Sequence, residues 1–311
     1  MGLTHFDEAP AYVRDHGHIQ GRWTQLGIGA GCKGVGVRRI EIPAGRWSTP
    51  VHEHGREEEI FYVLGGEGVS LLGGQATTVA AGDCAVYAPN CGAHSLYATE
   101  PLDVLAFGPR EYDESPGFPR LGMSIVGSRA VDSVGGTVDG EPIQFVREGR
   151  LGPPELPRHT GPRPASIVNV DDVEAIRRTH TRVDRTRRLV SRAAGAVETG
   201  LQHVVVVAGW ESTAQHCHSL EEEIFVVLDG GGVLVLDQEE TPVRPGHVIS
   251  RPPGTGVAHM FRAGEDGLTY LAYGTRHPGD VCYYPRSNKI AFRGVGLIAR
   301  LEQLDYWDGE D

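Results

Sequence analysis

The sequence has no long apolar run. No stretch of its 311 residues comes near the roughly 18 consecutive apolar residues that a membrane-spanning helix needs. The segment from Met1 to Asp7 has neither the basic start nor the apolar centre of a secretory signal. Phe6 stands where a myristoylation signal requires Ser or Thr. We therefore expect a cytoplasmic protein without a membrane partner.

Basic residues are also scarce. The chain has 29 Lys and Arg against 41 Asp and Glu, a formal net charge of −12. A globally acidic protein is a poor partner for phosphate backbones or anionic lipid. Nine arginines do fall between Arg158 and Arg192, but acidic residues are interleaved with them. We interpret that segment as a solvated connector and expect a small-molecule partner rather than nucleic acid.

Cysteine and helical patterns are sparse as well. The five cysteines are odd in number and form no Cys-x-x-Cys pair, so we interpret them as reduced thiols, consistent with a cytoplasmic location. Few segments repeat with a helical period, whereas 43 glycines and 20 prolines supply turns between short apolar runs. This composition favours an all-β fold.

What the sequence does contain is an internal duplication. Two 22-residue windows, beginning at Gly45 and Gly209, are identical at 13 positions with an offset of 164. Two copies are too few for a solenoid, and the length suits about two domains. The sequence therefore predicts two homologous domains. The positions that recur are Gly45, Ser48, Thr49, His52, His54, Glu57, Glu58, Glu59, Ile60, Phe61, Val63, Leu64 and Gly66.

Each copy contains a His-x-His pair, a run of three glutamates and a later histidine. In an extended segment the two rings of the pair lie on one face, with Cα atoms about 6.6 Å apart. Three imidazole nitrogens and one carboxylate oxygen suit a divalent transition metal and leave coordination positions open. The residues alone leave open which glutamate ligates. The histidines are His52, His54 and His94 in the first copy, and His216, His218 and His259 in the second.

This arrangement resembles the first motif of the cupin superfamily. The order Gly, His-x-His, Glu, Gly occurs in both copies, with six rather than five residues after the first glycine. Gly82 to His94 and Gly246 to His259 resemble the second motif, one and two residues longer than its usual form. The resemblance covers two regions of roughly 100 residues each. It implies two tandem jelly-roll barrels, each a double-stranded β-helix.

The resemblance also selects one glutamate in each triplet, the residue seven before the closing glycine. These residues are Glu59 and Glu223, which open the apolar strands and which we predict as catalytic as well as metal-ligating. The other glutamates of the triplets are assigned to a solvated turn. The predicted ligand sets are His52, His54, Glu59 and His94, and His216, His218, Glu223 and His259.

Ligand type alone is compatible with iron(II), manganese, nickel, zinc and copper. Cytosolic availability and the family point first to iron(II) or manganese, with up to one ion per barrel. The function expected is that of a metal-dependent enzyme, an oxygenase acting on a small oxygenated organic substrate. The alternatives are a redox-neutral isomerase, lyase or decarboxylase, and a small-molecule-binding protein without turnover.

We expect the first cupin barrel in residues 1–127, an irregular connector in 128–187, and the second barrel with a C-terminal tail in 188–311. The connector should contain one short helix over 171–178, where an acidic start precedes a basic end. The aromatic residues near 306 suggest that the tail docks on the body. Two fused barrels mimic a cupin dimer, so the chain is expected to be a monomer or a homodimer.

Candidate substrate-pocket residues come from strand parity and from alignment of the copies. Phe61 and Phe225 share the strand face of the predicted glutamate ligands. Arg38 aligns with Gln202, and Tyr87 with Arg251. Arg38 could hold a substrate carboxylate or lie at the strand flank. Since the copies differ at these places, they need not bind the same ligand.

Overall fold

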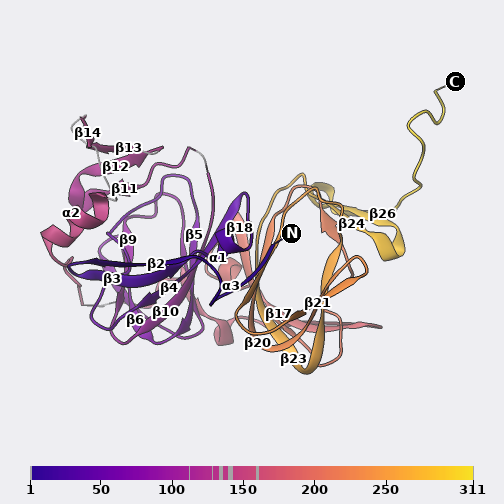
Figure 1. Ribbon diagram of the computed structural model, residues 1–311, viewed down its shortest axis with the longest axis horizontal. Coiled ribbons are helices and arrows are strands. Elements are labelled where there is room, and N and C mark those ends of the chain that lie inside the picture. Colours follow the sequence, from indigo (N-terminus) through magenta and orange to yellow (C-terminus); the bar gives the residue numbers. More distant parts are fainter. Residues whose placement is uncertain are drawn as a thin grey trace.

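The computed structural model describes residues 2–111, 113–127, 129–132, 136–138, 143–158 and 161–310. In these ranges strands dominate, and they form two barrels that lie side by side, each with a small antiparallel sheet beyond it (Figure 1). The prediction of an all-β fold with two tandem jelly-roll barrels is confirmed.

The first barrel consists of two antiparallel sheets. Its strands are β2 (Ala11–His16), β3 (Ile19–Thr24), β4 (Val35–Ile42), β5 (Glu59–Gly65), β6 (Glu67–Leu72), β7 (Gln75–Ala80), β8 (Asp83–Tyr87), β9 (His94–Ala98), β10 (Leu102–Pro109) and β15 (Ile167–Asn169). One sheet has the order β15-β8-β5-β10-β4-β3-β2, and the other has the order β7-β6-β9.

The second barrel repeats this plan with longer, bent strands. Its strands are β1 (Gly2–His5), β16 (Ile176–His180), β17 (Val183–Arg188), β18 (Thr199–Val206), β20 (Glu223–Leu236), β21 (Glu239–Val243), β22 (His247–Arg251) and β23 (His259–Thr275). The order is β1-β22-β20-β23-β18-β17-β16, with β21 paired to β20. Strand β20 spans the region that β5 and β6 cover in the first barrel.

The glycine that closes each repeat lies where the strand bends. Gly66 has φ +81° and Gly230 has φ +69°, a region that L side chains rarely adopt. A Cβ at Gly66 would lie 1.8 Å from the carbonyl oxygen of Pro101, and one at Gly230 would lie 2.3 Å from that of Gly267. The register of β20 shifts beside Gly230. Only glycine lets the chain bend here without displacing the neighbouring backbone.

The two barrels share a hydrophobic core. In β5, Phe61 and Val63 face the interior of the first barrel, whereas Ile60 and Tyr62 pack toward the second. Strand β20 alternates in the same way. Both faces of each strand are therefore buried, which explains why the strands are apolar throughout. Across the shared core the rings of Phe107 and Tyr273 lie 5.1 Å apart.

The middle glutamate of each triplet links the barrels. Glu58 accepts hydrogen bonds from the backbone N–H groups of Val197 and Thr199 (2.8 and 3.1 Å), and Glu222 accepts from those of Lys33 and Gly34 (2.8 and 2.6 Å). Glu58 and Glu222 are 1% and 3% exposed. The prediction of a solvated turn was wrong for them, and for the buried Glu221, because each carboxylate has a partner distant in sequence.

Two strands pair with a barrel other than the one that their position in the chain suggests. Strand β1 pairs with β22 of the second barrel, from Gly2 opposite Ser250 to His5 opposite His247. Strand β15, from the connector region, extends the first barrel by pairing with β8. Both pairings cross the boundaries proposed at 127 and 187, since β1 precedes the first barrel and β15 lies in the proposed connector.

The helices are few and short. They are α1 (Leu26–Gly29), α2 (Ile143–Leu151) and α3 (Val190–Ala193), with 3-10 turns η1 (Pro119–Leu121), η2 (Val170–Asp172), η3 (Pro285–Ser287) and η4 (Arg293–Val295). No helix among the described residues is long and apolar enough to cross a membrane. The helix predicted over 171–178 was wrong: η2 leads there into β16. Arg177 and Thr179, which share a strand face, both hydrogen-bond to Asp184 on β17 and favour the hairpin.

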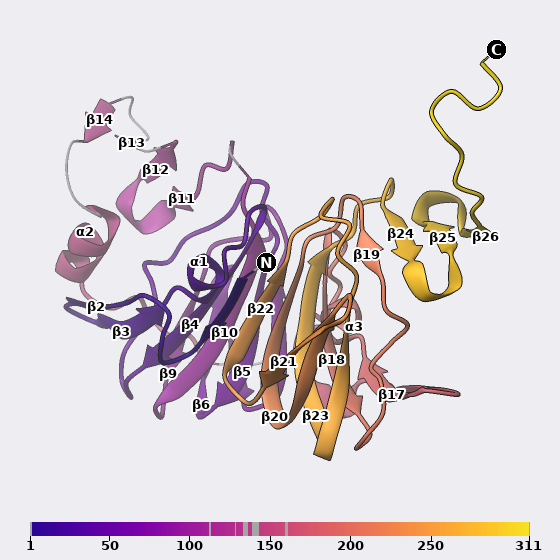
Figure 2. The ribbon, with the colours of Figure 1, turned by 45° about the vertical axis from the view of Figure 1, so that its right-hand side comes forward.

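A small antiparallel sheet follows each barrel. The first contains β11 (Gly117–Phe118), β12 (Met123–Val126), β13 (Arg129–Asp132) and β14 (Gly136–Val138), and the second contains β19 (Cys217–His218), β24 (Val281–Tyr284), β25 (Lys289–Phe292) and β26 (Leu297–Arg300). The tail after β26 extends away from the body (Figure 2). Tyr306 and Trp307 are 84% and 70% exposed, so the expected docking of the tail is not observed.

Candidate metal centres

The first centre forms where the segment before β5 meets the start of β9. His52 and His94 exchange backbone hydrogen bonds of 3.1 and 2.7 Å, which hold the two segments together. Oε2 of Glu59 lies 3.0 Å from Nε2 of His94 and 3.8 Å from Nε2 of both His52 and His54. Donor atoms of all four residues lie within 4.8 Å of one another. The predicted ligand set is thus brought together around one carboxylate oxygen.

Electrostatics in this centre suit a cation. Burial, and then the neighbouring His94, lowers the pKa of His52 from 6.5 to about 3. Burial raises the pKa of Glu59, but the hydrogen bond from His94 and the other two histidines together bring it to about 2. Both ring nitrogens of His54 are buried without a hydrogen-bond partner in the described part of the chain. The neutral imidazole of His52, the unpartnered ring of His54 and the ionised carboxylate of Glu59 fit a divalent transition metal.

The second centre has the same four residue types in a looser arrangement. Oε2 of Glu223 lies 3.0 Å from Nε2 of His259 and 3.4 Å from Nε2 of His218. Burial, and then His259, lowers the pKa of His216 to about 3. His216, Glu223 and His259 have donor atoms within 4.8 Å of one another, whereas His218 groups in this way with His216 and the thiol of Cys282. The third histidine, His218, is therefore displaced toward the thiol of Cys282.

A carboxylate that the sequence did not reveal holds His218. Nδ1–H of His218 donates to Oδ2 of Asp280 over 2.7 Å, which directs Nε2 toward Glu223. Asp280 also accepts from the backbone N–H groups of Leu220 and Glu221. In the first barrel Glu114 lies 3.6 Å from Nδ1 of His54 and accepts from three backbone N–H groups. Such partners orient metal-ligating histidines.

An aromatic ring covers the first histidine of each pair. Phe118 lies 6.1 Å from His52 with an interplanar angle of 27°, and Tyr284 lies 5.7 Å from His216 at 22°. Each ring precedes a Pro-Arg dipeptide, at an offset of 166 between the copies. This weak repeat of aromatic-Pro-Arg was the signal that could have located the covering ring and the supporting carboxylate four residues before it.

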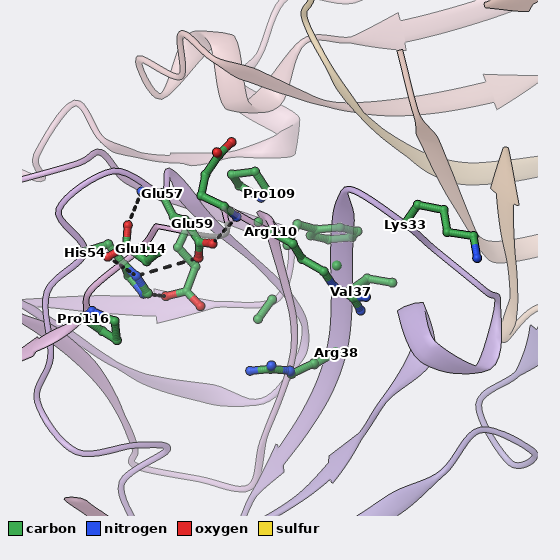
Figure 3. A pocket seen from close by; sticks show the side chains of 15 residues that line it. Lys33, Val37, Arg38, His54, Glu57, Glu59, Pro109, Arg110, Glu114 and Pro116 are labelled. Carbon is green, nitrogen blue, oxygen red and sulfur yellow. Dashed lines mark hydrogen bonds and ion pairs between the residues drawn. The ribbon is translucent and has the colours of Figure 1, made fainter. Parts of the chain in front are cut away.

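Both centres open into cavities. The first cavity has a volume of about 540 Å³ and is lined by His54, Glu59, Arg38 and other polar groups (Figure 3). In Figure 3 the Arg38 side chain extends toward the same space as Glu59. The second cavity has a volume of about 260 Å³, and Phe225 lies in its wall beside the histidines. The structure leaves room for a small molecule next to each candidate centre.

The candidate pocket residues divide into two groups. Arg38, Gln202 and Phe225 line the cavities. Phe61, Tyr87 and Arg251 do not. The ring of Tyr87 stacks on His94 at 4.1 Å, with Phe61 packed behind it, and Arg251 donates to the carbonyl of Val257 in the turn before His259. These three side chains pack against or hold the segments of the candidate ligands His94 and His259.

Comparison with known proteins agrees with this geometry. A cupin domain model matches residues 38–108 and again 202–272. The chain belongs to the cupin superfamily. Both matched segments contain the candidate ligands, so this cupin has two domains of the same family, as the duplication predicted. Over 59 residues it is 37% identical to the uncharacterized protein MJ1618 of Methanocaldococcus jannaschii. That match covers 19% of this chain and only 46% of the relative.

Solved structures resemble this cupin over different spans. Oxalate decarboxylase from Bacillus subtilis, which has Mn(II) centres, covers 90% of this chain and 79% of its own, with 14% identity and a TM-score of 0.58. A putative sugar phosphate isomerase from Acidithiobacillus ferrooxidans shares 26% identity over 44% of this chain and 92% of its own, with a TM-score of 0.40. The likeness to the decarboxylase concerns the two-barrel fold.

Proposed function

We propose that each barrel binds one divalent transition-metal ion and that the protein is a metal-dependent enzyme acting on a small, oxygen-rich organic molecule. The ligands would be His52, His54, Glu59 and His94 in the first barrel, and His216, His218, Glu223 and His259 in the second. The observation that carries the proposal is the convergence of three histidines on one glutamate oxygen in the first centre. Iron(II) or manganese is the first choice of metal.

A bound ion would supply Lewis acidity and, if redox-active, electrons, with positions left for substrate. The chain's own side chains would bind the ion and control the access of water to it. Without a metal, burial keeps His52 and His216 neutral by lowering the pKa of each to about 3, whereas Cys282, Glu223 and Asp280 outweigh burial at His218 and raise its pKa to about 10. In the second barrel Phe225, Phe261 and Val204 form an apolar wall of the cavity that limits access of water to the reacting atoms.

The reaction that we propose first is oxygenation of the substrate, because a small cavity beside a centre with open positions suits it. A redox-neutral reaction, such as decarboxylation, lyase chemistry or isomerisation, is the second candidate. It is favoured by Glu57, which lines the first cavity with its carboxylate 3.9 Å from Nδ1 of His54. A second carboxylate so placed could transfer a proton, which these reactions need. Ligand binding without turnover is the remaining alternative.

Metal content tests the assignment of ligands. Protein purified without added metal is expected to contain close to two equivalents by elemental analysis. His52→Ala and His216→Ala should each lose about one equivalent, because each would leave three protein ligands and a hole in one centre. Unchanged stoichiometry in either variant would remove the assignment for that barrel.

Reaction class is tested by loading the protein anaerobically. With iron(II), oxygen uptake across a panel of dicarbonyl compounds and catechols would support the oxygenase. With manganese or zinc under argon, turnover of hydroxy acids and oxo acids would support the redox-neutral alternative. Stoichiometric binding of a panel member without either activity would support the alternative of a binding protein without turnover.

The same proposal includes a cytoplasmic location, a monomeric or homodimeric state and the lack of a nucleic-acid partner. Size-exclusion chromatography measures the oligomeric state.

A further inference from the structure

The two cavities differ in charge. Four acidic residues line the first cavity (Glu57, Glu59, Glu111 and Glu114), against the three basic residues Lys33, Arg38 and Arg110. The second cavity is lined by Arg185, Arg187 and Arg293, and Glu223 is its one acidic residue within the described part of the chain. A positive cavity in a protein with net charge −12 is a local feature that requires its own explanation.

Two of these arginines have no anionic partner. Arg185 and Arg187 are two residues apart on β17, so both side chains lie on one face of the strand. Neither forms an ion pair in the described ranges, and the Nε atom of each is buried without an acceptor. Arg293, in contrast, pairs with Glu221. Burial, followed by the charge of Arg185, lowers the pKa of Arg187, so the pair is held at an electrostatic cost.

The first barrel lacks this pair. Arg187 lies opposite Val204 in the β17–β18 register, and the copy offset places Ile40 at the position of Val204. Opposite Ile40 lies Trp23, which is 2% exposed and packs in the core of the first barrel. Two residues before it, in the place of Arg185, lies Gly21. In the first barrel, therefore, a tryptophan fills this region. In the second barrel, the same region presents two guanidinium groups to a cavity.

The shape of the second cavity limits the ligand. Its volume of about 260 Å³ is below the range of typical drug-sized pockets, so the guest is small. The two Cα atoms lie about 6.6 Å apart along the strand, and each guanidinium presents a planar fork that matches a carboxylate. Gln202 lies in the same lining and adds an uncharged polar group. The wall of the cavity thus contains a candidate metal centre and, at another place, the two guanidinium groups of Arg185 and Arg187, which have no anionic partner.

We propose that the second barrel is the substrate barrel for a small organic carboxylate, whose carboxylate group is held by Arg185 and Arg187 beside the candidate centre of His216, His218, Glu223 and His259. This inference deepens the proposed function and rests on it. The first barrel, with its acid-rich cavity, does not bind the same anion.

Calorimetric titration of the manganese-loaded protein with malonate tests this assignment. We expect one site per chain, and the dissociation constant should rise about tenfold or more in Arg185→Gln and in Arg187→Gln, since charged hydrogen bonds to the ligand are lost. Arg38→Gln, which alters the cavity of the first barrel, is the matched control and should bind malonate as the wild type does. Malonamide, which has the same skeleton without charge, should not bind.

Metal analysis and thermal unfolding of every variant accompany the titrations. Malonate affinity that is unchanged in both arginine variants, or lowered equally by Arg38→Gln, would overturn the assignment, and so would tighter binding of inorganic phosphate than of malonate. Full metal loading without any malonate binding would defeat this inference and leave the metalloenzyme standing. Absence of metal from the wild-type centres would instead defeat the proposed function.

Discussion

At the scale of single residues, the three consecutive glutamates of the first repeat are divided between the cavity and the other barrel. The first and last of the triplet in the first barrel, Glu57 and Glu59, line the cavity. The middle one, Glu58, points to the opposite side and binds backbone N–H groups of the other barrel. Strand parity accounts for this division, because alternate side chains must face opposite ways. A change to any glutamate of this triplet would therefore affect either the cavity or the contact between the barrels.

Asp280 should matter to the second centre alone. Asp280→Asn keeps the shape of the side chain but removes the charge that accepts the proton of His218, so metal affinity of the second barrel should fall by about tenfold or more. Competition with a chelator, followed by elemental analysis, measures this affinity. Glu114→Gln is the counterpart and should weaken the first barrel instead. Loss of metal from both barrels in Asp280→Asn would contradict the local role of this carboxylate.

The buried histidines give the metal-free protein a pH dependence. The pKa of His52 and of His216 falls from 6.5 to about 3 on folding. Between these values the unfolded chain binds protons that the folded chain does not, so acid favours unfolding. The contribution of these two neutral rings to stability is fully present above pH 6.5 and should decline toward pH 3 by up to about 1.4 kcal/mol per pH unit for each histidine.

Thermal unfolding of chelator-treated protein across this range measures the effect. His52→Gln removes one of the two titrating groups, so its midpoint should depend less steeply on pH than that of the wild type. A midpoint that is the same at about pH 4 as at about pH 7, near the two ends of this pH range, would mean that these rings are not held neutral by the fold.

The candidate ligand histidines could be predicted from the sequence because the duplication repeats them with nearly the same spacing. Glu59 and Glu223 needed the family resemblance as well, since three adjacent glutamates look equivalent in a single chain. The supporting carboxylates escaped prediction for two physical reasons. Glu114 and Asp280 differ in residue type, and their offset is 166 rather than 164 because the second copy has two more residues between the glutamate triplet and the last strand of the barrel, one of them before His259.

At the scale of elements, the most consequential pairing is that of β1 with β22. Its four residues lie about 245 positions from their partners, a separation over which local patterns carry no information. The error over 171–178 has a related cause. An acidic start and a basic end suggest a helix when the segment is considered alone, but Asp184 on the next strand binds Arg177 and draws it into a hairpin.

Removal of residues 2–5 should therefore destabilise the second barrel although the segment precedes the first. The loss of the backbone hydrogen bonds to β22 and of the buried His5 side chain should cost about 2–4 kcal/mol of unfolding free energy. Limited proteolysis with mass mapping should show faster cleavage near β22. A control deletion of residues 302–310, which are exposed throughout, should leave both readings unchanged. Cleavage confined to the first barrel would contradict the pairing.

At the scale of the whole molecule, the barrels should unfold together. Glu58→Ala and Glu222→Ala would each remove two hydrogen bonds between backbone N–H groups and a buried carboxylate at the interface, each contributing about 1.5–3 kcal/mol. We expect one calorimetric transition in the wild type and two in the double variant. Glu240→Ala, which removes a partly exposed partner of Arg262, is the control and should keep a single transition. A single transition in the double variant would show that the shared apolar core suffices for coupling.

The reciprocal contacts of Glu58 and Glu222 have a further consequence for how this protein arose. Each half offers the other an equivalent glutamate, as the subunits of an isologous homodimer do. Fusion of two such subunits fixes their ratio at one to one and frees each from having to remain a copy of its neighbour. One pocket can then specialise for a new guest while the other stabilises the pair, and the opposite charges of the two cavities are what such a division of labour would leave behind.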